Sequence, residues 1–205
     1  MELTIKINGI APIIMHSGQT ADPLNPFAKA MKKCSGKRGK TDEDLEVLSN
    51  LEWWAGLYLD TPAVIADDFS VSVDKSAQLE LPAHIIDSCL REGARKVKLG
   101  KQASAGCIVT GPAVFTHDGP KNVNDLALNG KYAYRTAVKV GTAKVMRNRP
   151  IFPVWSAEFT VEMDASVIDA EQIMDAMRNA GKLVGIGDWR PGAPRGGYYG
   201  RFEVL

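Results

Sequence analysis

A glycine-rich run between residues 181 and 201 holds the residue types in this chain best suited to binding chemistry. Seven of the chain's 19 glycines lie there, at Gly181, Gly185, Gly187, Gly192, Gly196, Gly197 and Gly200. Between them stand three arginines and three aromatic residues, Arg190, Arg195, Arg201, Trp189, Tyr198 and Tyr199. Glycine lets a backbone approach a ligand, arginine donates a fork of hydrogen bonds to phosphate, and aromatic faces stack on bases. The run predicts a polyanion-binding loop, above all for a nucleic-acid strand; the alternative is a plain turn before a final strand.

Positive charge is gathered in clusters, although the formal net charge is only +1. The clusters span residues 29–40, 91–101, 131–149 and 178–201. Acidic residues concentrate in 42–60 and 158–175. This distribution can give a basic face for a polyanion and an acidic face that could meet a neighbouring copy. The residues that we expect to contact a strand are Lys98, Lys101, Arg147, Arg149, Trp189, Arg190, Arg195, Tyr198 and Arg201.

Few residues suit catalysis or metal binding. Asp22 is the only acid within residues 3–41 and lies in a predicted loop, where a turn-forming Asp-Pro is the simpler interpretation. His16 could act as a general base. The three histidines and three cysteines are scattered along the chain, and no phosphate-binding or dinucleotide fingerprint occurs. We therefore expect no metal and no cofactor.

The composition is that of an ordinary globular protein. A length of 205 residues and an apolar fraction of 45% fit one domain, residues 1–205. No apolar run approaches the roughly 18 residues that span a bilayer. Glu2 stands where a signal peptide would carry positive charge. We expect a cytoplasmic protein with no membrane partner.

Hydrophobic periodicity predicts a mixed α+β fold. The core elements are strand 2–9, helix 82–95, strand 107–116, strand 151–163, helix 169–180 and strand 200–205. This βαββαβ order is that of ferredoxin-like (RRM-like) folds. A helical insertion, residues 20–80, follows the first strand, and a β-ribbon, residues 129–149, separates the central strands. Within the insertion, residues 41–60 form a strong helix whose tryptophans belong to the core, and Gly181 is expected at the C-cap of the last helix.

Three stretches resemble the CRISPR-associated RAMP superfamily. The opening IKINGIAPIIMHSGQ is similar to the family's first strand and following turn. ELPAHIIDSCLREGAR is similar to its helix entry through Pro82, Leu90 and Arg91, while His84 and Asp87 depart from the small residues usual there. The final run is similar to the family's glycine-rich signature through Gly185, Gly187, Arg190, Gly197, Gly200 and Phe202.

Within that family the chain is most similar to the backbone subunits that assemble along a guide RNA. The resemblance implies binding of single-stranded RNA (or single-stranded DNA), self-association along the strand and contact with other ribonucleoprotein subunits. Residues 129–149 would be the thumb-like hairpin and residues 20–80 the inserted domain. The chain is short for such a subunit, which favours a stand-alone relative, for example one encoded by a mobile element.

Two other functions stay open at the level of sequence. One is a RAMP-type endoribonuclease that uses Asp22 or His16. The other is a virus-related assembly or decoy protein that binds another protein, with the acidic helix 41–60, including Trp53 and Trp54, as its interface.

Overall fold

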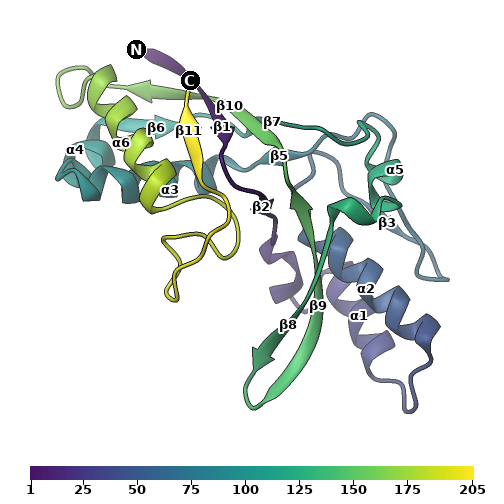
Figure 1. Ribbon diagram of the computed structural model, residues 1–205. Coiled ribbons are helices and arrows are strands. Elements are labelled where there is room, and N and C mark those ends of the chain that lie inside the picture. Colours follow the sequence, from purple (N-terminus) through teal and green to yellow (C-terminus); the bar gives the residue numbers. More distant parts are fainter. The chain divides into compact units, whose positions relative to one another are not determined.

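The computed structural model describes residues 1–205, apart from the side chain of Val140. The fold is mixed α+β with antiparallel sheets, which confirms the α+β class predicted from the sequence (Figure 1). The chain divides into two compact units. Unit 1 comprises Met1–Ile14, Leu79–Asp118 and Phe152–Leu205, and unit 2 comprises Met15–Gln78 and Gly119–Ile151.

Unit 1 is built on a six-stranded antiparallel sheet. Its strands are β1 (Glu2–Gly9), β5 (Glu80–Leu81), β6 (Cys107–Val109), β7 (Ala113–His117), β10 (Trp155–Met163) and β11 (Phe202–Val204). β1 and β10 pair along almost their whole length, from Glu2 opposite Glu162 to Asn8 opposite Ser156. β11 pairs with the other side of β1, whereas β6 and β7 both pair with β10 and β5 follows β7. Two strands far apart in the sequence therefore form the centre of the sheet.

One face of this sheet forms the core of unit 1. Ile5 and Ile7 of β1 and Phe159 of β10 are buried, while the alternate residues of both strands face outward. Two helices, α3 (Ala83–Lys96) and α6 (Ala170–Leu183), lie against each other over the unit (Figure 1). They approach closely at Gly93, where a Cβ atom would stand 2.3 Å from the carbonyl oxygen of Ala176. Larger residues there would force the two helices apart.

The end of α6 differs from the prediction. Gly181 was expected to cap the helix, but α6 continues to Leu183, and Gly185 takes the left-handed conformation (φ +70°) that follows its end. Gly181 lies inside the helix because β11 passes against it. A Cβ atom at this position would be 2.1 Å from the carbonyl oxygen of Phe202. Gly181 therefore allows α6 to pack closely against β11, and it does not end the helix.

Two further differences concern short segments of unit 1. The predicted strand 151–163 begins only at Trp155, because a bend at Pro153 and Val154 separates it from the preceding strand. Proline has no N–H to give to a sheet, which explains the interruption. A short helix that the sequence did not predict, α4 (Gly100–Gly106), follows α3. A two-residue strand, β2 (Ile13–Ile14), ends the first segment of the unit.

Unit 2 combines helices with a hairpin. Its elements are η1 (Gly18–Ala21), α1 (Pro26–Ser35), α2 (Asp42–Gly56), β3 (Val64–Ile65), β4 (Val71–Ser72), α5 (Val123–Ala127), η2 (Gly130–Tyr132), β8 (Ala133–Val140) and β9 (Ala143–Phe152), whose last residue belongs to unit 1. The antiparallel pairing of β8 with β9 confirms the hairpin predicted in this part of the sequence. A capping box between Thr41 and Asp44 starts α2. Trp53 and Trp54 are buried, as predicted, and the Trp53 indole donates a 2.8 Å hydrogen bond to the carbonyl of Tyr132.

None of the helices in the described part of the chain has the length and apolar character needed to cross a bilayer.

Candidate nucleic-acid interface

The glycine-rich loop, residues 184–201, connects α6 to β11 in unit 1 and is fixed by its own backbone. The N–H of Ile186 donates to the carbonyl of Gly200 at 2.9 Å, and the N–H of Tyr199 donates to the carbonyl of Trp189 at 3.2 Å. The N–H of Gly200 reaches the carbonyl of Pro12 at 2.8 Å. These bonds close the loop on itself and tie it to the segment that follows β1. The loop is a built structure and not a plain turn.

The glycines of this loop mainly make room for its own backbone. A Cβ atom at Gly197 would lie 1.7 Å from the carbonyl oxygen of Trp189, and one at Gly200 would lie 1.7 Å from that of Ile186. Gly187 approaches the carbonyl of Ile14 in the same way. Gly196, by contrast, is exposed, with no atom within 4 Å of an added Cβ. From the sequence we expect these glycines to let a ligand approach the backbone, whereas most of them permit close packing within the protein.

The packed backbone presents arginine and tyrosine side chains to solvent. Arg195 is exposed, and so is Tyr198, with 55% of its surface accessible. The guanidinium of Arg201 lies 4.7 Å from the centre of the Tyr198 ring, a cation–π contact. The Nε–H of Arg201 is buried and has no hydrogen-bond acceptor among the described residues. Positive charge and an aromatic face therefore meet at one place.

Two other predicted contact residues in the loop contribute to its structure. Arg190 is half-buried and donates from Nη1 to the carbonyl of Gly187 at 3.3 Å. Trp189 has a left-handed backbone (φ +50°), and its ring lies 6.3 Å from that of Tyr199. Both side chains are partly exposed, so they can touch a ligand while they hold the loop.

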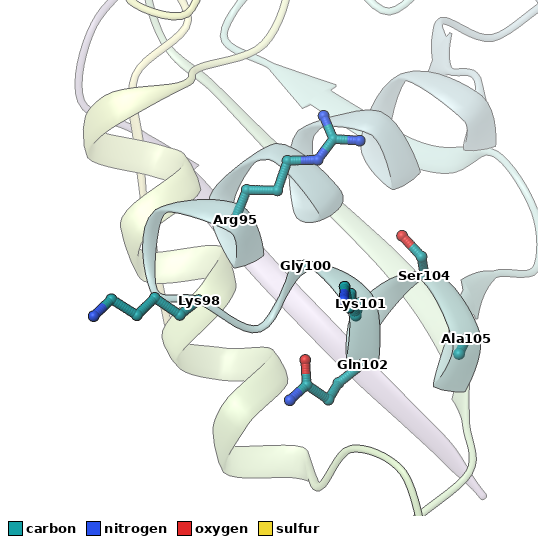
Figure 2. Close-up of a pocket in the computed structure, with 7 residues that line it drawn as sticks. All are labelled: Arg95, Lys98, Gly100, Lys101, Gln102, Ser104 and Ala105. Carbon is teal, nitrogen blue, oxygen red and sulfur yellow. The ribbon is translucent and has the colours of Figure 1, made fainter.

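Lys98 and Lys101 lie together at the junction of α3 and α4, also in unit 1. Both are exposed, and they line one shallow depression with Arg95 (Figure 2). Sequence reasoning identified the two lysines from their cluster but did not single out Arg95. Arg95 could have been predicted as a third member of this group, because it lies in the last turn of a predicted helix, three residues before Lys98.

Arg147 and Arg149 lie on β9 in unit 2, in a different setting. Arg147 pairs with the carboxylate of Glu52 at 2.5 Å, and the same carboxylate accepts the backbone N–H of Asn148 at 2.9 Å. Burial, followed by the nearby Arg147 charge, lowers the pKa of Arg149. Arg147 thus helps to hold the hairpin against α2, and unit 1 contains the remaining predicted contact residues.

Both candidate catalytic residues lie in unit 2, and a turn explains the position of Asp22. The Asp22 carboxylate accepts the N–H of Leu24 at 2.8 Å, the bond that defines an Asx turn. Burial, followed by the positive charges of Arg149 and Arg147, lowers the pKa of His16. No cluster of three His, Cys, Asp or Glu residues that could hold a metal ion occurs among the described residues.

The outer face of the unit 1 sheet is acidic; the sequence predicted an acidic face but did not place it on the sheet. Glu158 and Glu162 of β10 point outward, and so does Glu203 of β11, while Lys6 stands opposite Glu158. RNA-recognition modules bind RNA on the open face of a four-stranded sheet, where bases stack on aromatic side chains. The outward residues of β1 and β10 include no aromatic side chain. In WSAEFTVEM the two glutamates alternate with buried residues. This alternation predicts an acidic outer face once it is known which side of the strand is buried.

No protein-family model matches the sequence, and no curated protein shows significant similarity to it.

Proposed function

We propose that this chain is a RAMP-like protein that binds single-stranded nucleic acid, with RNA as the expected strand, through the glycine-rich loop. The observation that carries this proposal is the contact of Arg201 with the exposed Tyr198 ring, with Arg195 exposed on the same loop, on a backbone fixed by its own hydrogen bonds. Preorganised donors and an exposed aromatic face lower the entropic cost of binding a flexible strand.

The order of elements in unit 1 supports a ferredoxin-like core and hence the RAMP resemblance. Without the segments that form unit 2, the order runs β1, α3, β6 with β7, β10, α6 and β11. The neighbours in the sheet also suit a split βαβ arrangement, because β10 lies between β1 and β7. The helices α1 and α2 and the hairpin β8–β9 supply the inserted helical part and thumb-like ribbon of a backbone subunit.

The chemistry of binding follows from the residue types. Arg190, Arg195 and Arg201 neutralise phosphates, and Tyr198 stacks on a base. None of these contacts reads a base edge, so binding is tolerant of sequence and sensitive to salt. The acidic outer face of the sheet repels a polyanion, which directs the strand to the loop and away from the face that RNA-recognition modules use. Neighbouring copies or other ribonucleoprotein subunits would associate along the same strand.

The direct test is a titration of a labelled single-stranded oligonucleotide at several salt concentrations. Replacing Arg190 and Arg195 together with alanine should weaken binding to every sequence and reduce the salt slope by about 1.4, at about 0.7 per lost phosphate contact. Because Arg190 also bonds the loop backbone, the single substitution Arg195→Ala separates charge from structure. Arg178→Ala is the matched control, since Arg178 is exposed on α6 and pairs with Asp175. Unchanged affinity in the double variant would remove the loop from the binding site.

A second measurement tests association on a strand in the untreated protein. The absorbance ratio at 260 and 280 nm and the light-scattering mass are compared before and after ribonuclease. A large species that ribonuclease reduces is expected for a subunit assembled on RNA. A clean monomer or a small closed oligomer, unaffected by ribonuclease, would contradict assembly on RNA and favour a protein partner.

A further inference from the structure

A basic depression lies at the junction of α3 and α4 in unit 1, on a different part of the chain from the glycine-rich loop. Its volume is about 760 Å³. Arg95 comes from the last turn of α3, Lys98 from the connecting turn, and Lys101 from α4 (Figure 2). The remaining lining residues are Gly100, Gln102, Ser104 and Ala105. The lining thus combines three cations with two neutral hydrogen-bonding side chains and contains no carboxylate.

The three cations of this depression are not used by the protein itself. Elsewhere in the described structure Lys37, Arg91, Arg147 and Arg178 pair with carboxylates. Arg95, Lys98 and Lys101 form no such pair, and no side-chain hydrogen bond, with any described residue. These three cations line one depression without an acid, so an anion bound there would be stabilised.

The backbone of Lys98 adopts a conformation that lysine disfavours. Its φ is +63°, in the left-handed region, and it follows the end of α3 where glycine is the usual residue. The N–H of the next residue, Leu99, donates to the carbonyl of Ala94 at 2.8 Å and holds the turn. A glycine would relieve this strain, yet the sequence places a cation there. Strain of this kind at a charged residue points to function and not to stability.

The neighbouring glycine supports the arrangement of Arg95. A Cβ atom at Gly100 would stand 2.7 Å from Cγ of Arg95, so the stem of the arginine lies directly over this position. Alanine at Gly100 would therefore displace the guanidinium without removing any charge. This provides a variant that changes geometry alone.

We propose that the Arg95–Lys98–Lys101 depression is a phosphate-binding site, separate from the glycine-rich loop. The inference rests on the proposed function, because the phosphate would belong to the bound strand. An arginine fork with two ammonium groups and neutral donors suits the oxygens of a phosphate, whether an internal phosphodiester or a terminal phosphomonoester. The depression has no aromatic lining, so it holds phosphate and not a base.

One helix links the two sites. Cys89, in the middle of α3, donates from Sγ to the carbonyl of Gly185 at the start of the glycine-rich loop. Arg95 lies about 9 Å further along the same helix at 1.5 Å per residue. The start of the glycine-rich loop therefore lies within about two helical turns of Arg95 along α3.

The test compares Lys98→Gly, Lys101→Ala and Gly100→Ala with the control Lys6→Ala, which removes one exposed charge from the sheet face of the same unit. Binding of a short oligonucleotide, with and without a 5′-phosphate, is measured at several salt concentrations. Lys98→Gly should raise the thermal midpoint by about 2–4 °C, because it relieves the backbone, while it weakens binding about tenfold. Lys101→Ala should reduce the salt slope by about 0.7. Lys6→Ala should do neither.

The outcomes separate this site from the loop. Unchanged binding in Lys98→Gly and Lys101→Ala, with a loss in the Arg195→Ala variant, would overturn the phosphate site and leave the proposed function intact. A preference for the 5′-phosphorylated strand that disappears in Lys98→Gly identifies a terminal phosphate, and equal losses for both strands identify an internal one. If the natural chain binds no oligonucleotide, inorganic phosphate should still shift the amide NMR signals of residues 98–104. Absence of that shift, or equal competition by a glutamate peptide, would refute the proposal.

Discussion

The packing of the glycine-rich loop can be tested by adding single methyl groups to it. Gly200 and Gly196 both have left-handed backbones, with φ of +66° and +61°. An added Cβ at Gly200 would stand 1.7 Å from the carbonyl oxygen of Ile186, whereas at Gly196 nothing lies within 4 Å. Gly197 provides the third case. An added Cβ there would stand 1.7 Å from the carbonyl oxygen of Trp189, but the backbone of Gly197 is not left-handed. The three positions therefore separate backbone conformation from steric contact.

The expected losses differ in size. Gly196→Ala should cost about 1–2 kcal/mol of unfolding free energy, the usual price of a left-handed alanine. At Gly200 the backbones must separate by about 1.3 Å to restore the 3.0 Å that real Cβ contacts keep. That movement breaks the 2.9 Å bond between Ile186 and Gly200. The conformational cost, the lost hydrogen bond and the repacking together give about 3–5 kcal/mol. Gly197→Ala should fall between the two, at about 2–3 kcal/mol.

Thermal unfolding followed by circular dichroism measures these differences. At about 2–4 °C per kcal/mol, Gly200→Ala should lower the midpoint by roughly 6–20 °C and Gly196→Ala by only a few degrees. Gly18→Ala is the control, because Gly18 has neither a close contact nor a left-handed backbone. Equal effects at Gly196 and Gly200 would refute the conclusion that the loop is packed against its own backbone.

Three further predictions concern titratable side chains. Glu52→Gln should lower the unfolding free energy in urea by about 1–3 kcal/mol, because the carboxylate binds both Arg147 and the backbone N–H of Asn148; no loss would contradict this network. Burial is the largest cause of the lowered pKa of both His16 and His117, so the folded chain binds fewer protons than the unfolded chain below about pH 6.5. The free energy of unfolding should therefore rise with pH up to about pH 6.5 and level off above it. In urea titrations, a His16→Gln, His117→Gln double variant should show a weaker dependence of this free energy on pH. Burial raises the pKa of Cys89 to about 12, so this thiol should react with a thiol reagent only after unfolding; a fast reaction in the native protein would contradict its burial.

Local patterns in the sequence account for most elements, and long-range contacts account for the differences. The apolar spacing of α2 and α3 and the alternation in β1 and β10 predict these elements because each period is visible within a few residues. α4 has only seven residues, with a glycine at each end, which is too few to show a period. Gly181 looks like a cap in local sequence, since its contact with Phe202 depends on how β11 returns to α6.

In the candidate site, too, some features could be predicted from the sequence and others depend on the fold. The glycine-rich run was recognisable from composition, but the reason for its glycines was not. That reason lies in the carbonyls of Trp189 and Ile186, which approach Gly197 and Gly200 only in the folded loop. The grouping of Lys98 with Lys101 followed from the sequence, whereas the acidic outer face of the sheet required knowledge of which face the helices cover.

The central pairing of unit 1 has a consequence for the order of folding. β1 lies at the start of the chain, and its partner β10 begins only at Trp155, so β1 must wait during synthesis for more than two-thirds of the chain. Until then both of its edges are open, and ELTIKING is able to pair with a strand of another molecule. Closing so long a loop is entropically costly and slows folding. Unit 2 is formed from segments Met15–Gln78 and Gly119–Ile151, and its collapse would shorten the effective loop before β10 arrives. We therefore expect hydrogen-exchange labelling during refolding to detect protection in α2 before β1, and early chaperone dependence to map to the first strand.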